Sequence, residues 1–152
     1  MDNREKAQIR ILTAICMVLY LLLLFYVCFF SEAYRAEGAA DYRYNLVPFR
    51  EIIRFYSNID SLGFRAVFDN LLGNVIAFIP FGFFYPIIIK RHSSFWRTFF
   101  GALCLSLIIE TIQFLTKVGA FDVDDLILNT FGGVLGYLLF KLVNRIRRSH
   151  LG

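Results

Sequence analysis

The sequence predicts an all-α integral membrane protein, a bundle of four transmembrane helices with a long outer loop containing an interfacial helix. Two observations lead to this fold class. The chain of 152 residues is 58% hydrophobic and only 18% charged, whereas soluble domains carry about 25% charged residues. Residues 11–30 and 71–89 contain no charge at all, and each run is long enough to cross roughly 30 Å of hydrocarbon as a helix. These features exclude an ordinary soluble enzyme.

The four spans are expected at about residues 11–30, 71–89, 98–115 and 126–143, within a single domain that covers residues 1–152. The first span follows a charged leader, as the core of a signal peptide does. Its apolar core, however, is longer than the roughly 7–15 residues of a usual signal. We therefore interpret it as a retained anchor helix.

The distribution of charge predicts how the bundle is oriented. Ten of the sixteen Lys and Arg residues lie near the two termini and in the short segment 90–97, whereas the loops at 31–70 and 116–125 carry nine of the twelve acids. The positive-inside rule therefore places both termini in the cytoplasm and these two loops outside. The net charge of +4 reflects these basic flanks, and no block of like charges indicates a nucleic-acid partner.

The outer loop at residues 31–70 is too long for a plain connection between helices. After Pro48, apolar and charged side chains alternate at helical spacing, which predicts an amphipathic helix on the membrane surface. The apolar positions are Phe49, Ile52, Ile53 and Tyr56, and the charged ones are Arg50, Glu51 and Arg54. A second short helix is expected at about residues 63–70. The alternative is a disordered loop, and the many aromatic residues of the segment argue against it.

Polar residues within the spans all map to the outer third of the bilayer once the helices are oriented. The residues that form this expected layer are Asn70, Asn74, Glu110, Gln113, Asp125 and Asn129. Polar groups inside a membrane face the bundle interior or a wet cavity by default. Because three separate helices contribute, we expect a single polar layer inside the bundle.

Glu110 is the only acid within the third span. An ionisable residue at such a position is costly in lipid, so it requires a partner. Two alternatives remain open from the sequence. Glu110 either pairs near the interface with Arg50, Arg54 or Lys117, or it contacts a ligand.

Three acids, Asp122, Asp124 and Asp125, lie where the fourth span begins. Asp122 suits the N-cap of the helix and Asp125 the capping-box position three residues later. Asp124 is then left over, and together with Glu110 it is expected to bind a cation, an amine or a sugar hydroxyl. Oxygen ligands suit a divalent metal, but no histidine lies on this side to support zinc, so we expect neither a metal nor a cofactor.

Small residues on two spans predict close helix packing. Gly132, Gly133 and Gly136 share one stripe of the fourth span, and such stripes let helix backbones approach closely. Gly73 and Ala77 are expected to provide the matching face of the second span.

Four motifs occur along the chain in a recognisable order. They are NLVPF at residues 45–49, NLLGN at 70–74 with FIPFG at 78–82, ETIQ at 110–113, and DVDDLILNTFGGVLG at 122–136. Together they resemble the VanZ-like family of bacterial membrane proteins, over residues 45–142. The matching positions are Asn45, Pro48, Asn74, Pro80, Glu110, Gln113, Asp124, Asp125, Asn129 and Gly133.

This resemblance implies a multi-pass protein of the bacterial cell membrane, most familiar in Gram-positive bacteria. The founding member of the family confers low-level resistance to the lipoglycopeptide teicoplanin but not comparably to vancomycin, and the family has no established reaction. Many members carry an arginine just before the acidic motif, where this chain reads Gly119–Phe121. If that arginine binds an anionic ligand, either Lys117 or an arginine of the first loop must replace it here, or this chain has a different ligand.

The first functional hypothesis is a non-enzymatic protein that binds an amphiphile at the outer leaflet, either a lipoglycopeptide antibiotic or a lipid-linked wall precursor. Its candidate ligand-binding residues are Asn45, Arg50, Arg54, Asn74, Glu110, Gln113, Asp122, Asp124, Asp125 and Asn129. The alternative is an intramembrane enzyme that acts on an envelope lipid or wall precursor through Glu110 and Asp124. No nucleophile with an adjacent base supports it, because His92 and His150 are expected in the cytoplasm. A third hypothesis, a transporter or assembly partner, requires a homo-oligomer.

Overall fold

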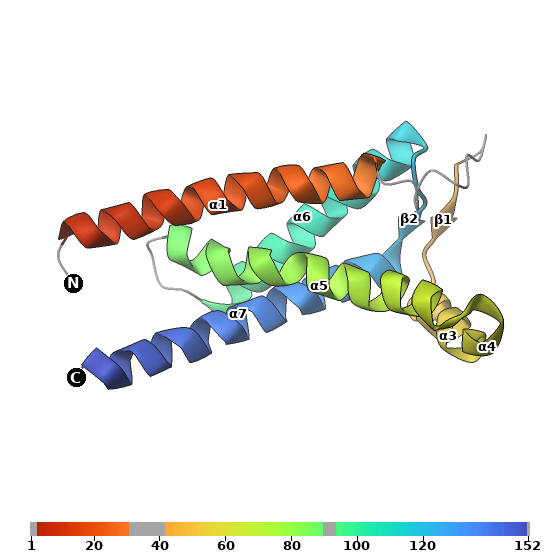
Figure 1. The fold of residues 1–152 in the computed structure, drawn as a ribbon. Coiled ribbons are helices and arrows are strands. Elements are labelled where there is room, and N and C mark those ends of the chain that lie inside the picture. The colour runs from red at the N-terminus through yellow and green to blue at the C-terminus, as the bar shows by residue number, and fades with distance from the viewer. Residues whose placement is uncertain (1–2, 31–41, 90–93, 152) are drawn as a thin grey trace.

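Four long helices dominate the computed structural model, which describes residues 3–30, 42–89 and 94–151 (Figure 1). They are α1 (Asn3–Phe30), α5 (Phe64–Ile88), α6 (Phe95–Thr116) and α7 (Val123–Leu151). Each contains a segment that is long and apolar enough to cross a membrane. The predicted fold class is therefore confirmed. Residues 31–41 of the expected outer loop and residues 90–93 of the short segment 90–97 lie outside the described residues.

The two ends of the bundle differ in what they carry (Figure 1). Both termini lie at one end, which we call the terminal end. The opposite end, which we call the loop end, carries α3 (Arg50–Ser57), α4 (Ile59–Leu62) and two short strands. The predicted helix after Pro48 is confirmed by α3, and none of its residues is buried. The short helix expected at 63–70 is the first part of α5.

The closest helix packing lies between α5 and α7, and it depends on glycine. A Cβ atom added to Gly132 would lie 2.1 Å from the backbone oxygen of Val75, and one added to Gly136 would lie 2.0 Å from that of Ile79. Since real side chains do not reach such distances, only glycine allows this approach. The matching face on α5 differs from the expected one, because a Cβ atom at Gly73 would meet nothing within 4 Å.

Helix α1 packs along α5 and turns its other side outward. The Tyr20 hydroxyl donates a hydrogen bond to the Ala77 carbonyl at 2.7 Å, and the Arg10 guanidinium donates one to the Ile88 carbonyl at 3.1 Å. Leu19 and Leu22 on the outward side are each more than 60% exposed. Such a surface is stable only against an apolar solvent, as expected for a helix in a bilayer.

The two strands join distant parts of the chain at the loop end. Strand β1 (Tyr44–Asn45) pairs in parallel with β2 (Phe121–Asp122), so that Asn45 lies beside Asp122. The Phe121 amide also donates a hydrogen bond to the carbonyl of Arg43 at 3.1 Å. This pairing fixes the segment before α3 to the start of α7.

Candidate functional site

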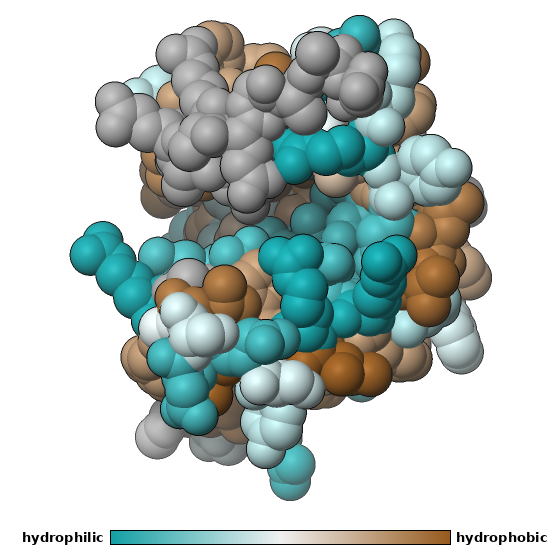
Figure 2. Space-filling view, turned by 90° about the vertical axis from the view of Figure 1, so that its right-hand side faces the viewer, coloured by the Kyte–Doolittle hydropathy of each residue, from teal (hydrophilic) through white to brown (hydrophobic). Residues whose placement is uncertain are grey.

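An open groove of about 580 Å³ lies at the loop end, where α3, the strand pair and the adjoining ends of α5, α6 and α7 meet. Figure 2 shows this end face-on, with hydrophilic residues gathered across it and hydrophobic ones beside them. The polar residues that line the groove are Arg43, Tyr44, Asn45, Arg50, Glu51, Arg54, Asp69, Asn70, Gln113, Asp122, Asp124 and Asp125. Its apolar lining includes Ile52, Phe55, Leu62, Leu71 and Leu128.

Asp122 connects three parts of the loop end. Its Oδ1 atom accepts hydrogen bonds from the Asn45 side-chain amide at 3.0 Å and from the Asp124 backbone amide at 2.8 Å. The second bond has the geometry of the cap predicted for α7. Burial raises the pKa of the Asp122 carboxyl above the usual aspartate value, whereas its two hydrogen bonds act to lower the pKa.

Asp124 has a different role from the one expected. The residue is 1% exposed, and its carboxylate accepts hydrogen bonds from the backbone amides of Phe49, Glu51 and Ile52. The Phe49 amide precedes α3, and the other two amides belong to its first turn, where helical amides lack partners within the helix. Asp124 is therefore not left over. It caps α3 from a residue that lies more than seventy positions further along the chain.

A left-handed backbone at Phe49 makes this arrangement fit. Phe49 precedes α3 with φ 65° and ψ 4°, a conformation that is uncommon for residues other than glycine. The turn lets its amide reach one oxygen of Asp124 while the Glu51 amide reaches the other at 2.7 Å. A carboxylate is also favoured here because the N-terminal end of a helix carries partial positive charge.

Glu110 is also tied to the backbone. The residue is 2% exposed, and its Oε2 atom accepts a hydrogen bond from the Asp122 amide at 3.0 Å. Two of the cations considered as partners make other contacts, since Arg54 forms an ion pair with Glu51 at 3.1 Å and the Lys117 ammonium lies 4.5 Å from the centre of the Tyr42 ring. Glu110 thus holds β2 in place from α6.

The remaining predicted residues link helices inside the bundle. The Asn74 side-chain amide donates to the carboxylate of Asp125, which joins α5 to α7. Gln113 donates to the carbonyl of Cys28 at 3.1 Å, which joins α6 to α1. One turn deeper, Asn129 donates to the Ser106 hydroxyl at 2.9 Å.

The structure brings most of the predicted site residues together. Those that line the groove are Asn45, Arg50, Arg54, Gln113, Asp122, Asp124 and Asp125, whereas Asn74, Glu110 and Asn129 lie outside its lining. The candidate list missed Arg43 and Glu51, which also line the groove. Glu51 had a signal in the sequence, because it lies between Arg50 and Arg54 in the predicted helix. Arg43 had none, because its place depends on the strand pair.

The groove lining combines three arginines with five acidic side chains. Arg50 is exposed, and the Arg54 side chain is 58% exposed. The carboxylates of Asp122, Asp124 and Asp125 already accept hydrogen bonds from the protein. Within the described ranges, no group of three His, Cys, Asp or Glu residues could hold a metal ion. The exposed arginines are suited to an anionic or hydroxyl-bearing group of a ligand.

These features define a small helical membrane protein whose acids and amides are joined at one end of the bundle beneath an open groove. A family model described as VanZ/LLP1 matches residues 17–144, and the chain belongs to this family. It is also 35% identical over 139 residues to Protein VanZ of Enterococcus faecium, in an alignment that covers 90% of this chain and 78% of that protein. The resemblance drawn from the motifs is thereby confirmed. No solved structure matches the chain.

Proposed function

We propose that this protein binds an amphiphile in the loop-end groove at the outer leaflet, and that this binding lowers sensitivity to teicoplanin-type lipoglycopeptides. The observation that carries the proposal is the groove itself, about 580 Å³, with Arg43, Arg50 and Arg54 in its lining. The ligand is either the lipoglycopeptide or a lipid-linked wall precursor. Both combine a polar head with an apolar tail.

The arginines supply the recognition of the polar head. Guanidinium groups bind carboxylate and phosphate through paired hydrogen bonds. The family resemblance implies an arginine before the acidic motif, at a place where Gly119 and Ala120 line the groove here. Under the proposal the arginines of the first loop take over the role of that residue, and the Arg43 backbone is joined to β2 because its carbonyl accepts a hydrogen bond from the Phe121 amide.

Exposed apolar side chains around the groove supply the recognition of the tail. Phe49 is 54% exposed, Ile53 61% and Tyr56 77%, all on or beside α3. Aromatic side chains of this kind are favoured at the membrane interface. An acyl tail would lie along them in the outer leaflet, and a lipid-tailed antibiotic would therefore be bound more strongly than an untailed one.

The proposal includes an orientation with the loop end outside and both termini in the cytoplasm. The basic residues of the terminal end support it through the positive-inside rule. A labelling experiment on single added cysteines, one at exposed Tyr56 and one at exposed Arg145, tests the orientation directly in intact cells. A reagent that cannot cross the membrane should modify only the cysteine at Tyr56.

The function is tested by expressing the protein in a teicoplanin-sensitive Gram-positive host and measuring inhibitory concentrations of teicoplanin and vancomycin. The wild type should raise the value for teicoplanin alone. The double variant Arg50→Gln/Arg54→Gln should return it to the vector level. The matched control is Arg65→Gln, which removes a cation from a side chain that is 96% exposed and lies outside the groove lining.

Membrane levels of all variants must be equal for the comparison to hold. Resistance that survives in the double variant, or that falls equally in the Arg65→Gln control, would contradict the proposed site. No rise with the wild type would contradict the resistance role itself, and binding of lipid-linked precursors to the purified protein would then decide whether the groove takes an amphiphile at all.

The enzymatic alternative relied on Glu110 and Asp124 as a carboxylate pair. In the structure each of these groups accepts hydrogen bonds from backbone amides, from Asp122 in one case and from the first turn of α3 in the other. Such engagement suits a structural role and gives the alternative no specific support. We therefore keep a binding function as the proposal.

A further inference from the structure

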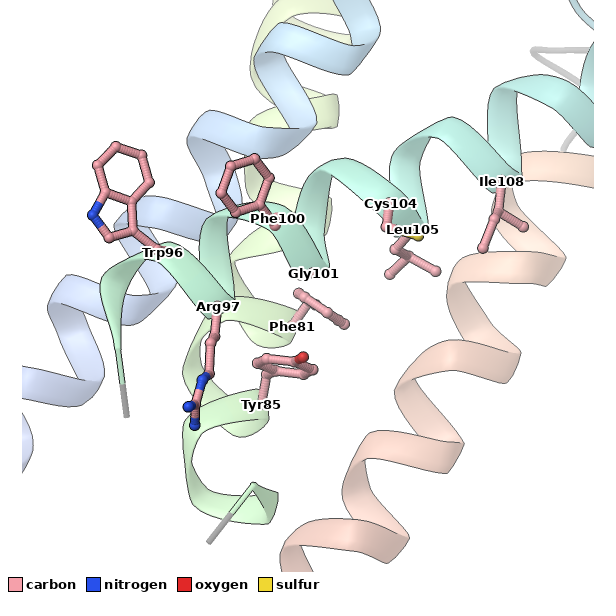
Figure 3. Close-up of a pocket in the computed structure, with 9 residues that line it drawn as sticks. All are labelled: Phe81, Tyr85, Trp96, Arg97, Phe100, Gly101, Cys104, Leu105 and Ile108. Atoms are coloured by element: carbon pink, nitrogen blue, oxygen red, sulfur yellow. The ribbon is translucent and has the colours of Figure 1, made fainter. Parts of the chain in front are cut away.

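A second groove lies on the opposite half of the bundle, on the outer surface of α5 and α6 (Figure 3). Its volume is about 610 Å³. The residues that line it are Phe81, Tyr85, Trp96, Arg97, Phe100, Gly101, Cys104, Leu105 and Ile108. All but Arg97 are uncharged, so that a single cation accompanies a long apolar surface.

The floor of this groove is formed by two aromatic rings of α5. Phe81 and Tyr85 stack with their centres 5.0 Å apart. Gly101 of α6 gives them room, because a Cβ atom there would lie 3.1 Å from the Cζ atom of Tyr85. The walls are open to the surroundings, with Trp96 61% and Ile108 51% exposed.

The cation lies at one end of the groove. Figure 3 shows Arg97 beside Tyr85, whereas Cys104, Leu105 and Ile108 follow along α6 away from it. Arg97 is exposed and belongs to the first turns of α6, at the terminal end of the bundle. Trp96, next to it, is of the residue type that is enriched at membrane interfaces.

The length of the groove matches one leaflet. Arg97 and Ile108 are eleven residues apart, which at 1.5 Å per residue corresponds to about 16 Å along the helix axis. Half of a typical hydrocarbon core is about 15 Å thick. A ligand that follows the groove from Arg97 would therefore reach the middle of the bilayer.

We propose that this groove binds an anionic phospholipid of the leaflet at the terminal end, with its phosphate at Arg97 and one acyl chain along Phe100, Cys104 and Ile108. The site is separate from the loop-end groove and does not depend on the proposed function. A second copy of this chain would also cover the apolar surface, but it offers no anionic group for the exposed Arg97 side chain. A phospholipid brings a phosphate to Arg97 and an acyl chain to the apolar wall.

The chain contains a convenient probe, since Trp96 is its single tryptophan and lines the groove. The purified protein is reconstituted in phosphatidylcholine vesicles with a small fraction of lipid whose acyl chains carry bromine, which quenches tryptophan on contact. Brominated phosphatidylglycerol should quench Trp96 at about one fifth of the mole fraction that brominated phosphatidylcholine requires. This ratio is the preference that one basic residue near an anionic lipid provides.

Two variants separate the contributions of charge and shape. Arg97→Gln should abolish the difference between the two lipids and leave quenching by phosphatidylcholine unchanged. Cys104→Phe should reduce quenching by both lipids, because the added ring occupies the groove. The matched control is Leu107→Phe, which places the same ring at a 45% exposed position of α6 outside the groove lining.

Equal quenching by the two lipids in the wild type would overturn the proposal, as would a preference that persists in Arg97→Gln. Protection of Trp96 from both lipids, together with disulfide crosslinking between Cys104 residues of two molecules, would show that a second copy occupies the groove and would overturn it as well.

Discussion

The carboxylate of Asp124 should be the main stabilising contact between α3 and the bundle. Hydrogen bonds to charged groups contribute about 1.5–3 kcal/mol each, and Asp124 accepts three of them. In Asp124→Ala all three amides lose this partner. Water that enters the space left by the carboxylate can replace part of the loss. We therefore expect the free energy of unfolding to fall by about 3 kcal/mol, which for a chain of this size lowers Tm by roughly 6–12 °C.

The assay is thermal unfolding of the purified protein in detergent, together with hydrogen exchange of the amides in residues 50–57. The matched control is Asp69→Asn, which removes one negative charge from a side chain that is 63% exposed and should change stability by less than about 0.5 kcal/mol. The explanation would be refuted if Asp124→Ala melted like the control and left the exchange of α3 unchanged.

Three further predictions concern other parts of the bundle. Gly136→Ala should lower Tm by several degrees, because the added Cβ atom would lie 2.0 Å from a backbone oxygen of α5. The control Gly73→Ala should leave Tm unchanged, because a Cβ atom there meets open space. Equal Tm values for the two variants would contradict the packing of α7 against α5. Asn74→Leu should destabilise the protein by about 1–3 kcal/mol, since it removes the donor to the partly buried Asp125 carboxylate, and a denaturant titration measures this. The raised pKa of Asp122 means that its folded state holds the proton more tightly than the unfolded chain does. Its contribution to stability is complete below the usual aspartate pKa and is lost as the pH rises through the raised value. Unfolding curves of Asp122→Asn should lack this dependence, and an unchanged slope would argue against it.

The spans and the polar layer could be predicted because both depend on local patterns. Uncharged runs of helical length identify α1 and α5 without any knowledge of their neighbours. Asn74 and Asp125 were expected in one layer because orientation alone places them at the same depth, and the structure joins them by a hydrogen bond.

The role of Asp124 could not be predicted, because its partners lie more than seventy residues away and are backbone amides, which any sequence provides. The strand pair was missed for a similar reason. Each strand has only two residues, which is too short to show a periodic pattern. From the sequence alone Asn45 is typical of a loop, and only the structure places it beside Asp122.

The groove at the terminal end was missed because α6 is apolar on most of its surface, so its sequence does not show which side packs and which side is open. Phe100 and Ala102 illustrate the difficulty. Phe100 is 58% exposed and Ala102 is fully buried, yet in the sequence both are hydrophobic residues within an uncharged run.

The bond between Asp124 and the first turn of α3 also has a consequence for the order of folding. During synthesis the segment before α5 emerges long before α7. The first amides of α3 therefore lack the Asp124 carboxylate until α7 has been synthesised. Contacts between such distant positions form late, because a long loop must close first. The groove thus exists only after the final helix has entered the membrane. A chain halted before that step would carry an undocked α3, which quality-control proteases could distinguish from the finished protein.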